Sequence, residues 1–117
     1  MVYGVGREMV DMTNMSMDQM QDNASQASGL LRSMANETRL MILCQLVSGK
    51  KSVGELHERI PLSQSALSQH LAVLRREKLV DTTRQAQSIF YSLASDEVHA
   101  VLGTLYQLYC ATDENPS

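Results

Sequence analysis

The sequence is poor in the residues that mark disulfide-rich proteins and many enzymes. Its 117 residues include no Trp, one Phe, two Pro and two Cys. The two cysteines, Cys44 and Cys110, lie far apart in the sequence, which disfavours a permanent disulfide in a reducing compartment. There is no Cys-x-x-Cys motif, no glycine-rich phosphate loop and no carboxylate pair suited to a cleft. We therefore expect neither an enzyme nor a catalytic residue.

Long hydrophobic runs are also absent. No apolar stretch reaches the length of a membrane span and no signal-peptide pattern opens the chain, so we expect a cytoplasmic protein without membrane contact. A chain of this length forms one domain. With so few aromatic residues, its core must consist of Leu, Val, Ile, Met and Ala. A small helical domain of this kind often covers further apolar surface in a dimer.

The sequence also has no excess of basic residues, since its net charge is −3. The charge is nevertheless unevenly distributed. Between Lys50 and Arg84 there are seven basic and four acidic residues, a net of +3, whereas the rest of the chain carries three basic and nine acidic residues. This segregation is compatible with one basic side that faces DNA and an acidic side that does not.

The chain is organised around the stretch from Ser63 to Val80. Leu67, Leu71 and Leu74 recur at helical spacing, and Ser63 is suited to cap the start of this helix. The opposite face is small, mostly uncharged and rich in hydrogen-bonding groups: Ser65, Ser68, Gln69, Ala72 and Arg76. Such a face suits a helix that enters the DNA major groove. The alternative for this helix alone is an exposed helix without a partner.

The preceding residues complete a helix-turn-helix. Ser52 is expected to cap a short helix from Val53 to about Ile60, with Glu55 completing a capping box, and Pro61 ends it. The turn leads directly to the next helix, which extends to about Glu77. A short helix, a tight turn and a second amphipathic helix are the pattern of this DNA-binding motif.

Two strands are predicted after the second helix, Leu79–Thr83 and Ser88–Leu93, joined by a hairpin at Arg84–Gln87. The predicted fold is therefore mainly α with a small β-hairpin wing, a winged helix-turn-helix of order α-α-α-α-β-β-α. The hairpin would carry Arg84 towards the DNA backbone or minor groove. The alternative is a plain solvated turn.

Three further helices are predicted around this motif. They are Met17–Met34, Glu37 to about Val47 with Asn36 as its cap, and a last helix from after Ser95 to about Ala111. We expect residues 1–16 to be a mobile tail, 17–111 the DNA-binding and dimerisation domain, and 112–117 a second tail.

The last helix has a wide apolar stripe, which implies a partner surface. We expect it to pack against the Met17–Met34 helix of a second copy, so that a symmetric homodimer places two recognition helices on a near-palindromic operator in double-stranded DNA. In the second predicted helix, Leu40, Leu43, Cys44 and Val47 share a face. On this basis alone, Cys44 is most simply a small core residue.

The residues that we predict to contact DNA lie on the recognition helix, at its ends and on the wing. They are Ser63, Gln64, Ser65, Ser68, Gln69, His70, Arg75, Arg76, Arg84 and Gln87. Hydroxyl and amide groups meet base edges, whereas the arginines meet phosphates.

Four segments carry a family resemblance: MANETRLMILCQL, SVGEL, LSQSALSQHLAVLRR and IFYSL. They resemble the ArsR family of dimeric winged-helix transcriptional regulators over about residues 27–111, and most closely its HlyU, BigR and SqrR group. Regulators of that group have matching cysteines at Cys44 and Cys110. The resemblance implies that these thiols sense reactive sulfur species, persulfides or polysulfides, by forming a disulfide or polysulfide bridge within one subunit that releases DNA. This implication replaces the core role of Cys44.

One position departs from the family, which usually has Gly where this chain has Lys78. A left-handed helix cap there would cost a lysine about 1 kcal/mol. Either the helix ends differently, or Lys78 compensates by reaching a DNA phosphate.

Other functions remain open. One is a metal-responsive repressor of the ArsR type, although His57, His70 and His99 are scattered and are expected to be ordinary structural or surface histidines without metal or cofactor. A second is a redox-insensitive virulence regulator that displaces a silencing protein. A third is a protein-interaction module that does not bind DNA.

Overall fold

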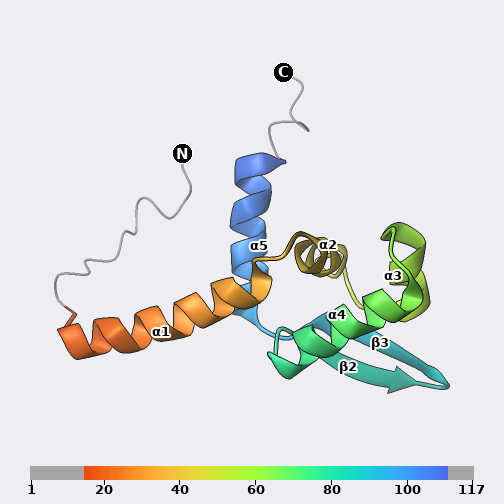
Figure 1. The fold of residues 1–117 in the computed structure, drawn as a ribbon, viewed down its shortest axis with the longest axis horizontal. Coiled ribbons are helices and arrows are strands. Elements are labelled where there is room, and N and C mark those ends of the chain that lie inside the picture. The colour runs from red at the N-terminus through yellow and green to blue at the C-terminus, as the bar shows by residue number, and fades with distance from the viewer. Residues whose placement is uncertain (1–14, 111–117) are drawn as a thin grey trace. The chain divides into compact units, whose positions relative to one another are not determined.

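A computed structural model of the chain describes residues 15–110, so the two expected tails lie almost wholly outside this range, as does Ala111. The contacts divide the chain into two units, residues 1–32 and 33–117, which are described separately. The elements (Figure 1) are α1 (Met17–Met34), α2 (Glu37–Gln45), β1 (Lys51–Ser52), α3 (Val53–Arg59), α4 (Gln64–Arg76), β2 (Val80–Gln85), β3 (Ser88–Leu93) and α5 (Asp96–Tyr109). They confirm the predicted, mainly helical winged helix-turn-helix.

Most of α1 belongs to the first unit. Ser16 caps this helix, because its Oγ accepts a hydrogen bond from the backbone N–H of Gln19 at 3.1 Å while Gln19 Oε1 accepts one from Ser16 N–H at 3.1 Å. Met17 and Leu31 are exposed. The predicted helix is confirmed with its bounds.

Side-chain caps begin the helices of the second unit at the positions that the sequence predicts. Asn36, Ser52, Ser63 and Ser95 each accept a hydrogen bond from a backbone N–H three residues later. At Ser52 the capping box with Glu55 is complete. These local hydrogen bonds satisfy donors that the helix leaves unpaired, which is why each helix begins where it does.

The core of the second unit is apolar, and none of its described residues is a buried polar or charged one. It consists of Met34, Ile42, Leu43, Leu46, Leu56, Ile60, Leu67, Leu71, Leu74, Leu79, Val80, Val98 and Leu102. The predicted leucine stripe of α4 is therefore confirmed. Because Leu67, Leu71 and Leu74 anchor one side of α4, its other side is fixed towards solvent.

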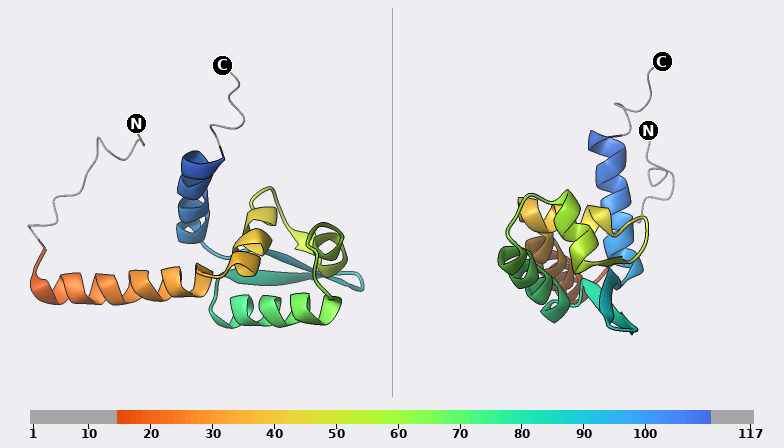
Figure 2. Two further views of the ribbon diagram at one scale, coloured as in Figure 1. Left: turned by 45° about the horizontal axis from the view of Figure 1, so that its top comes forward. Right: turned by 90° about the vertical axis from the view of Figure 1, so that its right-hand side faces the viewer.

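A three-stranded antiparallel sheet of order β1-β3-β2 completes the second unit. The strand β1, which the sequence analysis did not predict, pairs Lys51 with Tyr91 and Ser52 with Phe90. The helix α4 lies beside the sheet and contacts β2 (Figure 2). The turn between β2 and β3 extends past the neighbouring helices at the same side as the start of α4.

The wing differs from its prediction in one respect. The predicted connection Arg84–Gln87 is too long, because β2 continues to Gln85, where it pairs with Ser88. Only Ala86 and Gln87 form the turn, and Ala86 takes a positive φ of 57°. Continued strand pairing satisfies more backbone groups than a four-residue loop would, and two-residue loops are the commonest hairpin connections.

Lys78 ends the recognition helix in the left-handed conformation, with φ 66°. Its N–H donates to the carbonyl of Arg75 at 3.0 Å, and the N–H of Leu79 donates to that of Leu74 at 2.8 Å. These two bonds are the Schellman motif, which usually has Gly at this position. The alternative that the helix ends differently is therefore excluded, because it ends as in a glycine-capped relative despite the lysine.

We predict that Lys78→Gly stabilises the reduced protein by about 0.5–1 kcal/mol. Glycine removes the left-handed strain of a side chain, and this gain exceeds the extra entropy of glycine in the unfolded chain. Urea unfolding at a fixed protein concentration measures the effect. Ala72→Gly, in the exposed interior of α4, is the matched control and should destabilise by about 1 kcal/mol. Equal losses in both variants would contradict the prediction.

No helix between residues 15 and 110 is both long enough and apolar enough to cross a membrane.

Candidate nucleic-acid interface and dithiol site

The outward side of α4 presents the side chains that the sequence assigns to base recognition. Ser65, Ser68 and Gln69 are exposed, whereas His70 is only half-exposed at the edge of this surface. Gln64, Arg75 and Arg76 are exposed along the same helix. Because the buried leucines fix the opposite side, this surface of α4 is held rigidly towards solvent.

Ser63 is less available for DNA than its neighbours are. Its Oγ already accepts the hydrogen bond from Ala66 N–H at 3.1 Å and lies 3.4 Å from Ser65 Oγ. The hydroxyl is therefore committed to the helix start, although it remains exposed. Its predicted contact with DNA would have to use the hydroxyl proton.

The wing carries two of the predicted residues. Arg84 lies within β2, opposite Ile89, and Gln87 lies in the turn; both are exposed. Side chains two residues apart in a strand share a face, so Arg84 lies on the same face of β2 as Thr82 and the buried Val80. Because β2 packs on α4, this arginine lies on the side of the strand that faces the recognition helix.

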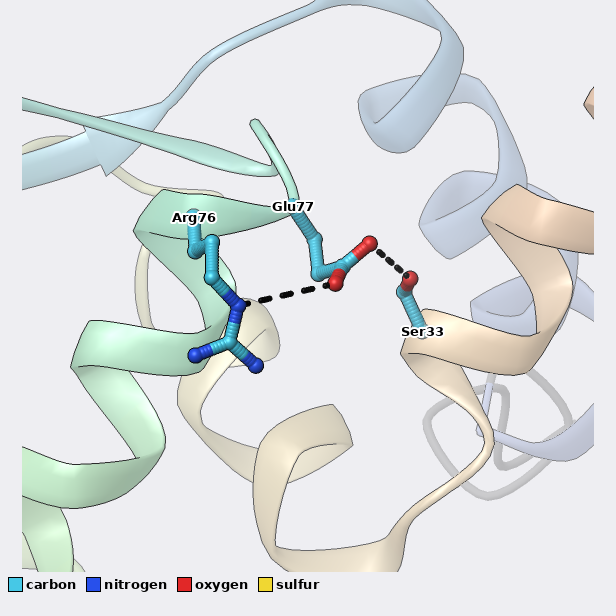
Figure 3. Close-up of polar contacts among 3 residues, drawn as sticks. All are labelled: Ser33, Arg76 and Glu77. Carbon is cyan, nitrogen blue, oxygen red and sulfur yellow. Dashed lines mark hydrogen bonds and ion pairs between the residues drawn. The ribbon is translucent and has the colours of Figure 1, made fainter.

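A polar cluster at the end of α4 was not predicted (Figure 3). Arg76 Nε lies 3.9 Å from Glu77 Oε2, and Ser33 Oγ donates to Glu77 Oε1 at 3.4 Å. The sequence signal was the acidic residue directly after two arginines. The side chains of Arg76 and Glu77 are exposed, so this ion pair contributes little to stability and leaves Arg76 free to exchange Glu77 for a phosphate.

Both cysteines are exposed free thiols. Cys44 lies on α2, and Cys110 is the C-cap of α5, where its N–H donates to the carbonyl of Tyr106. The interpretation of Cys44 as a core residue was therefore wrong. The side chains of α2 that enter the core are Ile42 and Leu43, followed by Leu46 just after the helix, because these positions face α4.

The two thiols interact electrostatically. The pKa of Cys44 is raised, first because neighbouring atoms displace water from its thiolate and second because a negative charge on Cys110 repels it. This second cause requires that two residues 66 positions apart in the sequence lie near each other in the fold. The raised pKa favours the protonated thiol of Cys44, which makes it a poor first nucleophile and able to donate a proton.

We predict that alkylation of Cys44 follows pH with a midpoint above that of an ordinary cysteine, because the reactive thiolate forms only at higher pH. Cys110→Ser should lower this midpoint, since it removes the repelling charge, but should not restore the ordinary value while the burial remains. Peptide mass spectrometry after pulses of iodoacetamide at several pH values measures both midpoints. An unchanged midpoint in Cys110→Ser would show that the thiols do not interact.

Among the residues that the structure describes, histidines and acidic residues form no comparable cluster. Between residues 15 and 110, no three His, Cys, Asp or Glu side chains come together as ligands of a metal ion would. His57 and His99 are exposed and His70 half-exposed, on three different helices. The metal-sensing alternative therefore has no ligand set within the described part of one chain.

Comparison with known proteins shows which family this chain is similar to. The profile of "Bacterial regulatory protein, arsR family" matches residues 36–82. The chain is 52% identical over 100 residues to the transcriptional activator HlyU of Vibrio cholerae, covering 86% of this chain and 93% of that protein. It is 40% identical over 106 residues to a biofilm growth-associated repressor of Agrobacterium fabrum, covering 91% of each. The crystal structure of HlyU from Vibrio vulnificus matches with a TM-score of 0.78 and 52% identity, covering 82% of this chain and 100% of that one.

Proposed function

The chain belongs to the ArsR family of DNA-binding transcriptional regulators, and we propose that reactive sulfur species control its affinity for an operator through Cys44 and Cys110. One observation carries this proposal: two exposed, unbonded thiols, 66 positions apart in the sequence, lie close enough for a charge on Cys110 to raise the pKa of Cys44. Persulfides and polysulfides react with such thiols, and a second thiol nearby resolves the adduct.

The chemistry requires a persulfide as oxidant. The thiolate of Cys110 attacks the terminal sulfur of a persulfide RS–SH; its S–S bond breaks, and RS⁻ leaves. Cys44, held as a thiol, gives its proton to RS⁻. The resulting Cys44 thiolate then attacks the inner sulfur of the Cys110 persulfide, and HS⁻ leaves as the Cys44–Cys110 disulfide forms. Two electrons pass from the protein thiols to the persulfide. A bridge of three sulfurs requires a second molecule of persulfide, which converts Cys44 into a persulfide as RS⁻ leaves; the terminal sulfur of the Cys110 persulfide then attacks the inner sulfur of the Cys44 persulfide, and HS⁻ leaves.

We assign DNA binding to α4 and the wing, as the sequence predicts. We assign base contacts to Ser65, Ser68 and Gln69, and phosphate contacts to Arg75 and Arg84. Further contacts come from Ser63, Gln64, His70, Arg76 and Gln87. All of these side chains except that of His70 are exposed. This arrangement matches the division of labour in protein–DNA interfaces, where phosphate contacts position the protein and base contacts specify the sequence.

A homodimer on a near-palindromic operator completes the proposal. On α5, Leu108 and Tyr109 are 48% and 72% exposed, an unusual position for large apolar side chains on a small domain. We propose that they pack against α1 of a second copy. A bridge at the end of α5 would then alter the dimer and the spacing of its recognition helices. We propose that the protein acts in the cytoplasm, where the DNA of a bacterium lies.

Whether the DNA-bound protein represses or activates transcription does not depend on how the thiols control DNA binding. The two curated relatives carry opposite names, an activator and a repressor. The same release of DNA relieves repression where this protein itself blocks a promoter. It restores silencing where this protein displaces a silencing protein.

A DNA-shift assay paired with intact mass spectrometry tests the proposal. The reduced protein should retard its operator, and a persulfide donor should abolish this shift. The mass of the protein should fall by about 2 Da when a disulfide forms, and each further sulfur in the bridge should add about 32 Da to the mass of the disulfide form. Dithiothreitol should restore both. Release of DNA without a change in mass, or a bridge without release of DNA, would contradict the proposal.

A further inference from the structure

A small groove of about 290 Å³ lies beside Cys44. Side chains of α2 form one wall, and the end of α3 forms the other. Three apolar residues, Leu40, Met41 and Ile60, contribute to its surface together with the Cys44 thiol. The volume is close to the lower end of the range for small-molecule sites, so it suits a ligand of amino-acid size.

Two opposite charges lie on the same groove. Glu37, from the first turn of α2, and Arg59, from the last turn of α3, both line it. Neither side chain forms an ion pair or hydrogen bond with any other residue between 15 and 110. The two charges therefore form no ion pair with each other and are available to a ligand that carries the opposite charge at each end.

We propose that this groove binds the inducer as a zwitterionic amino-acid persulfide, with its carboxylate on Arg59, its ammonium group on Glu37 and its sulfur chain beside Cys44. Apolar contacts with Leu40, Met41 and Ile60 take up the methylene group and keep water from the sulfur atoms. The inference rests on the proposed function, to which it adds the chemical class of the inducer. An inorganic hydropolysulfide or an uncharged persulfide lacks the groups that the groove recognises.

Binding before reaction has a kinetic consequence. A persulfide held beside Cys44 is attacked by Cys110, whose charge acts on Cys44, within a complex. The rate of bridge formation therefore levels off as the groove fills. An uncharged persulfide reacts only by collision, and its rate rises in proportion to its concentration. The comparison of these two probes thus separates recognition by the groove from the intrinsic reactivity of the cysteines.

The experiment follows the loss of thiols in the reduced full-length protein without DNA, by acid quench and mass spectrometry. Cysteine persulfide and the persulfide of 2-mercaptoethanol are the two probes. We expect saturation with the first and a linear dependence with the second. Arg59→Gln should abolish saturation and slow the reaction with dilute cysteine persulfide about tenfold, the lower end of the effect of a charge-assisted hydrogen bond. It should leave the 2-mercaptoethanol probe unchanged.

Controls separate the ligand from other effects of charge. Glu37→Gln should also slow only the zwitterionic probe, whereas Arg32→Gln, an exposed arginine on α1 and outside the groove, should change neither rate. Linear kinetics with both probes, or an Arg59→Gln variant that slows both equally, would overturn the groove assignment and leave the dithiol switch intact. A wild-type protein that forms a bridge with neither probe would overturn the proposed function itself.

Discussion

Replacing either cysteine with serine is expected to abolish the response to persulfide while the reduced protein keeps its operator affinity. Cys44 and Cys110 are both exposed, so the exchange of sulfur for oxygen leaves no cavity in the core. Neither residue belongs to the surface of α4 or to the wing. We expect the dissociation constant of each reduced variant to remain within about twofold of the wild type, the effect usual for a neutral surface substitution.

The size of the wild-type response can be bounded. A bridge that closes the 66-residue separation constrains the chain by about 4 kcal/mol in the loop-entropy model. Only the part of this free energy that differs between the DNA-competent and DNA-incompetent forms lowers affinity. Since each factor of ten requires about 1.4 kcal/mol, the response should lie between about tenfold and a thousandfold. In both serine variants it should vanish.

A titration of labelled operator with and without a persulfide donor measures this response. The two variants also report on the order of steps. Cys44→Ser, which keeps Cys110, should accumulate a persulfide of about 32 Da, whereas Cys110→Ser should gain it more slowly because Cys44 is held protonated. The double variant controls for modification elsewhere. A single-cysteine variant that still releases DNA on treatment would exclude the dithiol switch.

The features predicted correctly from the sequence are those set by local chemistry. The caps at Asn36, Ser52 and Ser63 bond to backbone three residues away, so the residue type and its spacing suffice to predict them. The leucine stripe of α4 is interrupted by polar residues, which leaves only one face that is able to enter a core. The exposed recognition surface is the necessary counterpart of that stripe.

The face of α2 could not be predicted in the same way. From Leu40 to Val47 the sequence is apolar at every position except Gln45, so helical spacing fits more than one face. Packing against α4, which is distant in the sequence, buries Ile42 beside the predicted Leu43 and leaves Cys44 exposed. The error in the placement of Cys44 follows directly from this ambiguity.

Other parts of the site depend on distant partners as well. The two-residue strand β1 exists only because Lys51 and Ser52 pair with Tyr91 and Phe90 of β3. The groove beside Cys44 forms where the end of α3 meets α2, and nothing in the local sequence around Arg59 indicates that this residue faces the cysteine helix. The pairing of the two thiols was implied by a family resemblance alone. It stays a prediction, compatible with the charge on Cys110 that helps to raise the pKa of Cys44.

Removing the amide of Gln69 should weaken specific DNA binding far more than non-specific binding. Gln69 is exposed on the outward side of α4, which the buried leucines hold in place. A glutamine amide can bond two groups on the edge of adenine, and the loss of such a contact costs about 1–3 kcal/mol. Gln69→Ala should therefore weaken operator binding about 5- to 150-fold, as measured by fluorescence anisotropy at one salt concentration.

Arg84→Ala is expected to act differently, and the contrast tests the assignment of the two surfaces. A phosphate contact carries no sequence information, so its loss should weaken specific and non-specific binding alike and reduce the salt dependence by about one counterion. Gln21→Ala, an exposed glutamine on α1, is the matched control and should change neither. If Gln69→Ala weakened random DNA as much as the operator, Gln69 would be a backbone contact. The base-reading part of α4 would then lie elsewhere on its exposed side, at Ser65 and Ser68 towards its start.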